Sequence, residues 1–200
     1  MKQQIIIIHG GTTFKTYKDY ISYLNTKEIS LEKLKLFKEW KDSLMDKLGS
    51  SFEVLLPRMP NGSNARCKEW KIWFERIIPF LNDGVILIGH SLGGIFLAKY
   101  LSEYPFPKRI KATVLVAAPF DDVDSEESLA DFKLPSSLSK FAKQGGEIYL
   151  IQSKDDPVVP FEHLGKYKKA LPNAKTLIFR DREHFKQETF PEIIKLIRNL

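Results

Sequence analysis

The sequence predicts an α/β fold, a three-layer sandwich in which a mostly parallel sheet of about six strands carries helices on both faces. Two observations support this prediction. Segments with the helical spacing of apolar residues alternate with short apolar segments, and such alternation forms parallel sheets through right-handed crossovers. The short segments are apolar along nearly their whole length, as strands covered on both faces must be: Gln4–Ile8, Phe52–Leu56, Val85–Ile88, Ala112–Ala117, Glu147–Ile151 and Thr176–Phe179.

The helices are predicted from apolar stripes and from residues that favour helix ends. Ser30 is a suitable cap for a helix whose stripe runs from Leu31 to Leu48 and which ends at Gly49. Other helices are expected between the strands and after the last one: Thr16–Leu24, Ala65–Ile78, Gly93–Ser102, Pro160–Ala170 and Pro191–Leu200. The last two open with proline, which the first helical turn tolerates.

Length and composition indicate a single globular domain over residues 1–200, with 43% hydrophobic residues available for a core. The single cysteine, Cys67, excludes a disulfide framework and a cysteine-based zinc site.

Charge and the N-terminal segment bear on partners and location. The net charge is +6, but the lysines are mixed with acids along the predicted helices, so we expect no nucleic-acid partner. The apolar segment Ile5–Ile8 is too short for a signal peptide or membrane helix, which predicts a cytoplasmic protein without a membrane span.

Two connections are longer than the joining of elements requires, Gly10–Ser30 and Pro119–Gly146. Both follow predicted strands, so both should rise from the carboxyl edge of the sheet, where open α/β sheets bind ligands. Long loops in compact domains often serve as lids. We therefore expect possible lid segments at residues 12–30 and 119–146.

The segment that indicates a catalytic function is Gly89-His90-Ser91-Leu92-Gly93. It forms a G-x-S-x-G motif between a predicted strand and a predicted helix. A serine on so tight a turn requires glycine two positions to either side, because Cβ atoms there would collide. The following helix directs its N-terminus toward the serine and favours developing negative charge. In this context the motif predicts that Ser91 is a nucleophile rather than a helix cap.

A serine nucleophile needs a base, and the chain has four histidines. His184 follows the last predicted strand and therefore lies at the same sheet edge as Ser91, which makes it the predicted base. His90 should point away from the serine and pack or form a hydrogen bond beneath the turn. His9 is expected to brace the loop that it precedes, and His163 to be a surface residue.

The base in turn needs an orienting acid, and carboxylates that accept a histidine N–H come from strand-end loops. Asp155 and Asp156 follow the fifth predicted strand, between the serine and the histidine in the chain. Asp121 and Asp122, after the fourth strand, are more distant alternatives. The residues alone leave the choice between Asp155 and Asp156 open.

Taken together, His9-Gly10-Gly11, the G-x-S-x-G segment, Asp155-Asp156-Pro157-Val158-Val159-Pro160 and His184-Phe185 resemble the α/β-hydrolase superfamily. The small size resembles its compact branch of retinoblastoma-binding-protein-9-like serine hydrolases. This resemblance implies Asp156 as the acid, and an oxyanion hole formed by the backbone N–H groups of Leu92 and Gly11, with Thr12 as the alternative to Gly11. One departure is Glu183 before His184, where many members have glycine.

The function expected from these residues is hydrolysis of a carboxylic ester or related acyl bond through a Ser91–His184–Asp156 triad and an acyl-enzyme. The expected partner is a small-molecule acyl substrate, and no metal or cofactor is implied, because no histidine and acid pattern has ligand spacing. The alternative is a protein-binding module on a hydrolase scaffold with a slow or vestigial site. Six acids and no base within residues 121–131 also suggest a preference for neutral or cationic esters.

Overall fold

The computed structural model describes residues 2–35, 37–123 and 128–200. Its centre is a six-stranded sheet in the order β2-β1-β3-β4-β5-β6, and every neighbouring pair is parallel. The strands lie within a few residues of the predicted ones: β1 Gln3–Ile8, β2 Phe52–Leu55, β3 Val85–His90, β4 Ile110–Val116, β5 Glu147–Ser153 and β6 Lys175–Phe179. The predicted fold class is confirmed.

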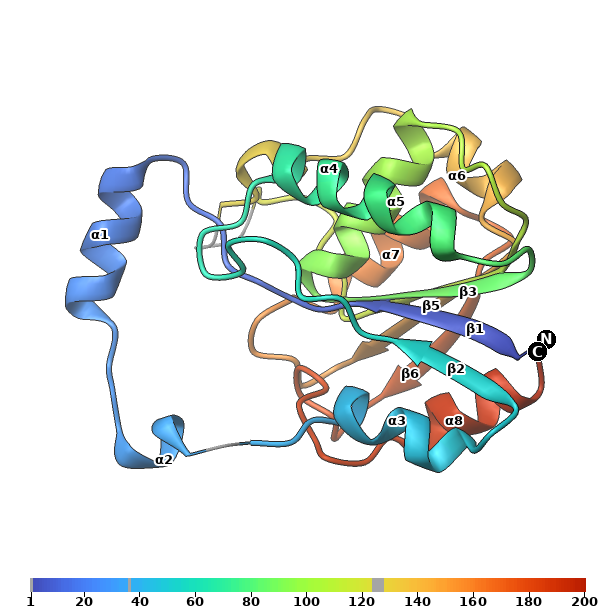
Figure 1. Cartoon of the computed structure of the whole chain (residues 1–200). Coiled ribbons are helices and arrows are strands. Elements are labelled where there is room, and N and C mark those ends of the chain that lie inside the picture. Colours follow the sequence, from blue (N-terminus) through green and yellow to red (C-terminus); the bar gives the residue numbers. More distant parts are fainter. Residues whose placement is uncertain (1, 36, 124–127) are drawn as a thin grey trace.

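Helices cover both faces of the sheet, with α4, α5, α6 and α7 on one face and α3 and α8 on the other (Figure 1). The α-helices are α1 Tyr17–Thr26, α2 Leu31–Leu34, α3 Trp40–Leu48, α4 Cys67–Ile77, α5 Leu92–Glu103, α6 Ser139–Gln144, α7 Glu162–Ala170 and α8 Pro191–Arg198. Two short 3-10 helices, η1 Ile78–Phe80 and η2 Ala130–Phe132, complete the described elements.

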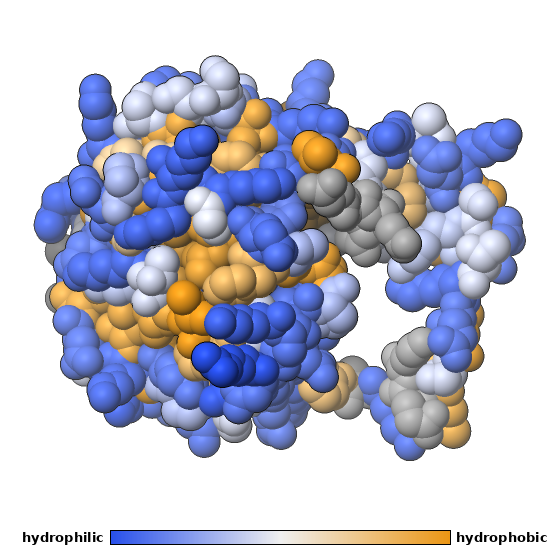
Figure 2. Space-filling view, turned by 180° about the vertical axis from the view of Figure 1, so that it is seen from behind, coloured by the Kyte–Doolittle hydropathy of each residue, from blue (hydrophilic) through white to orange (hydrophobic). Residues whose placement is uncertain are grey.

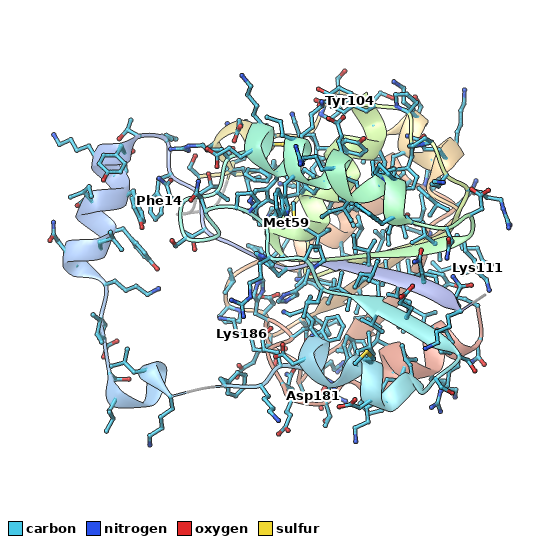
Figure 3. The ribbon with its side chains drawn as sticks, viewed as in Figure 1. Phe14, Met59, Tyr104, Lys111, Asp181 and Lys186 are labelled. Carbon is cyan, nitrogen blue, oxygen red and sulfur yellow. The ribbon has the colours of Figure 1, made fainter. Side chains whose placement is uncertain are left out.

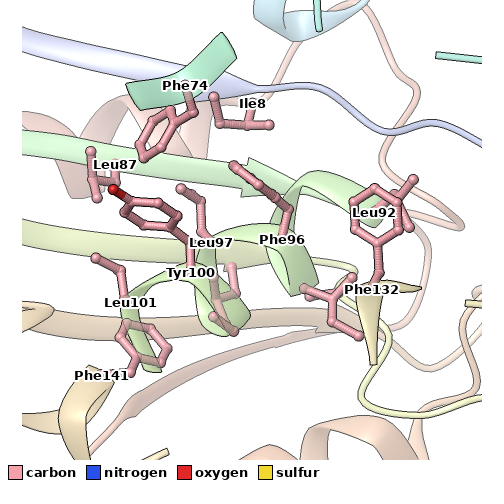
Figure 4. Packing of buried hydrophobic residues seen from close by; sticks show 14 of the residues in the cluster. Ile8, Phe74, Leu87, Leu92, Phe96, Leu97, Tyr100, Leu101, Phe132 and Phe141 are labelled. Atoms are coloured by element: carbon pink, nitrogen blue, oxygen red, sulfur yellow. The ribbon is translucent and has the colours of Figure 1, made fainter. Parts of the chain in front are cut away.

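Two hydrophobic clusters fill the space on the two sides of the sheet. On one side, aromatic residues of α4, α5 and η2 pack together, including Phe74, Phe96 and Phe132 (Figure 4). On the other side, Trp40 of α3 packs with residues of the C-terminal segment. The residues Ile5–Ile8 of β1 contribute alternately to both clusters and are all 0% exposed, which explains why this strand is apolar at consecutive positions.

The prediction of a single helix after Ser30 is wrong, because this segment forms two separate helices, α2 and α3. The Glu39 N–H donates to Asp42 Oδ2 at 2.9 Å, which caps the start of α3. Leu31 and Leu34 are 69% and 70% exposed, whereas Trp40 is 1% exposed. Only the second half of the predicted apolar stripe therefore faces the core.

The two long connections differ in how they join the body. Residues 17–35, here called the arm, carry α1 and α2 away from the layers (Figure 1), and no residue of α1 is buried. The space-filling view shows an opening between the arm and the body (Figure 2). The second connection packs onto the body through buried Leu129, Phe132, Leu138 and Phe141, while residues 124–127 lie outside the described residues.

None of the helices within the described residues has the length and apolarity to cross a membrane. The cytoplasmic location stays a prediction.

Candidate active site

Ser91 lies on the sharp turn between β3 and α5, with a φ of 55° in the left-handed region. Its N–H donates to the Val116 carbonyl at 2.8 Å, which fixes the turn to the end of β4. A Cβ on Gly89 would lie 2.5 Å from the Gly93 carbonyl oxygen, and one on Gly93 would overlap the Ile8 carbonyl. Both positions therefore require glycine. At Gly93, however, the added Cβ would collide with the β1 backbone rather than with Gly89.

His184 and Asp156 form a hydrogen-bonded pair at the carboxyl edge of the sheet. His184 Nδ1 lies 2.9 Å from Asp156 Oδ2 and 3.0 Å from Oδ1. The Asp156 side chain is 0% exposed, and its Oδ1 also accepts the N–H groups of Val158 and Val159 at 2.8 and 3.0 Å. These bonds hold the carboxylate in one orientation, as an acid that positions an imidazole requires.

Asp155 faces different groups. Its Oδ1 accepts from the Ser153 hydroxyl at 2.5 Å and from the Glu183 N–H at 3.1 Å, and the Ser153 hydrogen bond lowers the pKa of this carboxyl. Asp155 therefore joins the end of β5 to the loop that carries His184 without contacting the imidazole. Asp121 and Asp122, the more distant alternatives, pair instead with lysines of the fold, Lys166 and Lys133.

Ser91 and His184 line the same pocket, which has a volume of about 400 Å³ and also includes His9, Gly10, His90 and Val158. Within the described residues, no hydrogen bond joins the Ser91 hydroxyl to the imidazole. Catalytic hydrogen bonds of this kind often tighten only when the substrate binds. The structure therefore brings Ser91, Asp156 and His184 to one place.

A second, smaller pocket of about 30 Å³ adjoins Ser91 and includes both Gly11 and Leu92. Leu92 is the first residue of α5, so its N–H has no intrahelical acceptor. In the described part of the chain, neither the Gly11 nor the Leu92 amide donates to a backbone carbonyl, whereas the Thr12 N–H donates to the Gly62 carbonyl at 2.9 Å. Two unused amides thus lie beside Ser91.

His90 lies beneath the turn and contacts the backbone of His184. Lys41 Nζ lies 3.0 Å from His90 Nδ1, so this nitrogen accepts and Nε2–H donates to the His184 carbonyl at 2.8 Å. Burial lowers the pKa of His90 well below its usual value, and the nearby Lys41 charge adds to this effect. Burial also lowers the pKa of Lys41, which forms an ion pair with Glu39. The imidazole is therefore neutral.

The N-terminus of α3 holds the loop that follows His184. The Trp40 N–H donates to the Gln187 carbonyl at 2.8 Å, and the indole Nε1–H donates to the Phe185 carbonyl at 3.0 Å. The Ser43 hydroxyl donates to the Glu188 carbonyl at 3.2 Å. Sequence reasoning missed this support, because nothing in the sequence relates residues that are about 145 positions apart.

The two remaining histidines brace loops near the site. His9 Nδ1 lies 2.5 Å from the Gly10 carbonyl oxygen, in the loop that His9 was expected to brace. Its Nε2 also accepts the Met59 N–H at 2.8 Å, so it holds the connection after β2 as well. His163 is 3% exposed, and its Nδ1 accepts the Phe120 N–H at 2.8 Å, so the prediction of a surface histidine was wrong. Buried Leu164 and Tyr167 lie one and four positions further along α7, and this spacing could have identified its inner face.

Among the described residues, no group of three or more His, Cys, Asp or Glu side chains is arranged to hold a metal ion.

The parallel sheet and the serine on a strand–turn–helix connection place this chain among proteins of the α/β-hydrolase fold. Within this fold it falls in the compact branch of retinoblastoma-binding-protein-9-like serine hydrolases. The family model described as "Serine hydrolase" matches residues 37–192, and the chain belongs to this family. The protein is therefore a hydrolase.

Individual relatives agree with this assignment. The serine hydrolase RBBP9 of Rattus norvegicus is 28% identical over 151 residues, which cover 74% of this chain and 78% of the relative. The solved structure of the ydeN gene product from Bacillus subtilis has a TM-score of 0.79 at 19% identity, covering 99% of this chain and 98% of that one. A carboxylesterase structure from Nitrososphaera gargenis has a TM-score of 0.61 at 15% identity, covering 99% and 89%. These two structures support the fold.

Proposed function

We propose that the protein hydrolyses a carboxylic ester or related acyl bond, with Ser91 as nucleophile, His184 as general base and Asp156 as the orienting acid. The observation that carries this proposal is the buried Asp156–His184 pair beside a serine held at a φ of 55°. A carboxylesterase among the proteins of similar fold is in keeping with it.

The reaction follows from the hydrogen bonds of the imidazole. Because His184 Nδ1–H donates to Asp156, Nε2 is the nitrogen that takes the Ser91 proton. The Ser91 oxygen forms a bond to the acyl carbon, and the carbonyl electron pair moves to its oxygen. When the tetrahedral intermediate collapses, the bond to the leaving alcohol breaks and His184 donates the proton to that alcohol. Water then attacks the acyl-enzyme through the same base and releases the acid and free Ser91.

The developing oxyanion would accept the N–H groups of Leu92 and Gly11. Both amides line the small pocket with Ser91, and neither donates to a backbone carbonyl in the described structure. Thr12 is the weaker candidate because its N–H already donates to Gly62. Preorganised donors of this kind lower the barrier because they need no rearrangement when charge develops.

Both long connections contribute residues to the two pockets. Tyr23 and Lys27 from the arm line the larger pocket, so residues 12–30 would cover bound substrate as a lid. Pro119, Asp121 and Leu129 from the second connection line the smaller one. A volume of about 30 Å³ favours a small group on that side of the scissile bond, such as a short acyl chain.

Hydrolysis of p-nitrophenyl esters of increasing acyl length tests this function. We expect p-nitrophenyl acetate to be hydrolysed, longer chains to be hydrolysed more slowly, and Ser91→Ala to remove the activity. The folded state of Ser91→Ala is checked by circular dichroism. If a purified, folded protein hydrolyses none of the esters, or if Ser91→Ala is equally active, the triad proposal is wrong, and a slow or vestigial site on a hydrolase scaffold becomes the better explanation.

A further inference from the structure

The larger pocket beside Ser91 is lined by three lysines, Lys27, Lys41 and Lys186. They come from the arm, from α3 and from the loop after His184. The one acid among the described lining residues is Glu39, which forms an ion pair with Lys41. Positive charge therefore predominates on the wall of this pocket.

Lys27 and Lys186 are the two lysines whose charge is available to a ligand. Neither forms an ion pair with an acid of the described residues. Lys27 Nζ lies 4.9 Å from the centre of the Tyr23 ring, and the exposed Lys186 lies on the side of the body that faces the arm (Figure 3). Lys41 and Lys186 both line the larger pocket. Burial is the main cause that lowers the pKa of Lys41, and repulsion from Lys186 adds to this effect.

The acid-rich segment 121–131 does not offset this charge within the described residues. Its three described acids have partners elsewhere in the fold: Asp121 pairs with Lys166 at 2.8 Å, Asp122 with Lys133 at 3.0 Å, and Asp131 accepts the Cys67 N–H at 2.9 Å. Asp124, Glu126 and Glu127 lie outside the described residues. The described acids of this segment therefore give no support to the preference for neutral or cationic esters that the sequence suggested.

We propose that this pocket binds a carboxylate on the substrate through Lys186 and Lys27, so that the enzyme prefers anionic esters. The inference rests on the proposed function, because it concerns the same site. The two pockets share Gly11, Ser91 and Val158, so an ester bond at Ser91 would lie at their boundary. The small pocket would take a short uncharged group, and the larger pocket the part that carries the carboxylate.

The roles of the two lysines differ by position. Lys186 follows His184 by two residues, so it is fixed to the body close to the reacting bond. Lys27 belongs to the arm, so a bound carboxylate would link the arm to the body across the pocket. Lys41 also lines the pocket, but its ammonium group already forms an ion pair with Glu39 and a hydrogen bond with His90. We therefore assign no ligand contact to it.

Two acetate esters test the proposal, 4-acetoxybenzoate and 4-acetoxybenzamide. They share the acetyl group and have leaving groups of nearly equal shape, one with a carboxylate and one with a neutral amide. The measurement is the ratio of their kcat/KM values, each divided by the rate of hydrolysis by hydroxide. At low salt the ratio should favour the carboxylate ester, and it should fall by about tenfold in the double variant Lys27→Gln/Lys186→Gln.

Three controls make the result specific. Lys143→Gln removes an exposed lysine on α6 and should leave the ratio unchanged. Lys186→Arg keeps the charge and should retain the preference. Added salt should weaken the preference, because the Debye length shortens to about 8 Å at physiological ionic strength. A ratio that favours the amide ester, or one that the double variant leaves unchanged, would overturn the proposal.

Binding to Ser91→Ala separates this inference from the proposed function. The variant lacks the nucleophile, so calorimetry can compare the affinities of the two intact esters without turnover. Tighter binding of 4-acetoxybenzoate, lost in Ser91→Ala/Lys27→Gln/Lys186→Gln, supports the carboxylate site even if esterase activity is absent. Equal affinity for both esters would show that the pocket does not bind the carboxylate, even if Ser91-dependent hydrolysis is observed.

Discussion

Asp155 and Asp156 are neighbours in the sequence, but their carboxylates lie in different surroundings. Lys154 and Asp155 form a turn directly after β5, and Pro157 biases Asp156 towards extended backbone angles. Asp156 contacts His184 Nδ1, while Asp155 contacts Ser153 and the Glu183 amide. The structure thus separates a carboxylate that faces the imidazole from one that supports its loop.

Asp156→Asn is expected to reduce kcat by up to ~10⁴, the scale observed when a triad histidine loses its orienting acid. Asp155→Asn should reduce kcat much less, because it weakens only the support of the loop that carries His184. Steady-state kinetics with p-nitrophenyl acetate provide the comparison. If Asp155→Asn is the more damaging of the two, the assignment of the acid is wrong.

The depressed pKa of His90 makes the stability of the protein depend on pH. In the unfolded chain the His90 imidazole takes up a proton near pH 6.5. In the folded protein the same imidazole is buried beside Lys41 and stays neutral to lower pH. Below pH 6.5 the unfolded state therefore binds more protons, so stability rises with pH and falls as the solution is acidified.

Replacing His90 by glutamine tests this linkage, because glutamine can donate to the His184 carbonyl but does not titrate. Between pH 7 and pH 5, the wild-type free energy of unfolding should fall more steeply than that of His90→Gln, with a difference in slope approaching ~1.4 kcal/mol per pH unit. Urea unfolding at several pH values measures both slopes. Parallel curves would mean that folded His90 titrates as it does in the unfolded chain.

At the scale of elements, the N-terminus of α3 positions the loop that contains His184. Trp40 is 1% exposed and donates both its N–H groups to that loop, while Lys41 reaches the same segment through His90. α3 thus links the arm that precedes it to the proposed base.

Trp40→Phe removes the indole donor and leaves the Phe185 carbonyl without its partner. We expect a loss of stability of about 1–3 kcal/mol, the cost of an unsatisfied buried polar group, and a lower kcat because the His184 loop is less well held. Trp73→Phe is the matched control, since Trp73 is 43% exposed. Equal kcat and equal melting temperature for the two variants would show that α3 does not position the loop.

The close approach of α5 to β1 can be tested with two helical glycines. A Cβ on Gly93 would overlap the Ile8 carbonyl, so Gly93→Ala should prevent folding or abolish activity. A Cβ on Gly165 of α7 would meet nothing within 4 Å, so Gly165→Ala should stabilise the protein by roughly 0.5–1 kcal/mol. Thermal unfolding of both variants measures the difference. A Gly93→Ala protein as stable and active as wild type would contradict the described packing.

At the scale of the whole molecule, the parallel sheet brings distant segments to one edge. Ser91 follows β3, Asp156 follows β5 and His184 follows β6, so the fold places all three at the carboxyl ends of the strands. These positions could be predicted because continuous apolar runs such as Ile5–Ile8 mark buried strands, and strand order along the chain fixes which loops share an edge.

Other features could not be predicted because they depend on contacts between segments far apart in the chain. The stripe from Leu31 to Leu48 has helical spacing throughout, but tertiary contacts at Trp40 decide where α3 begins. The lysines of the larger pocket come from three separate segments, and each alone resembles a solvated surface residue. By contrast, the acids of 121–131 are conspicuous in sequence, yet the described ones are paired or act as caps.

Covalent labelling by a fluorophosphonate, followed by peptide mass spectrometry, tests the central claim most directly. A fluorophosphonate reacts far faster with an activated serine than with other hydroxyl groups, so the wild-type protein should carry one adduct, on the peptide that contains Ser91. His184→Gln should label far more slowly, because the hydroxyl loses its base. An adduct on another serine, or an unlabelled Ser91 in folded wild-type protein, would contradict the account.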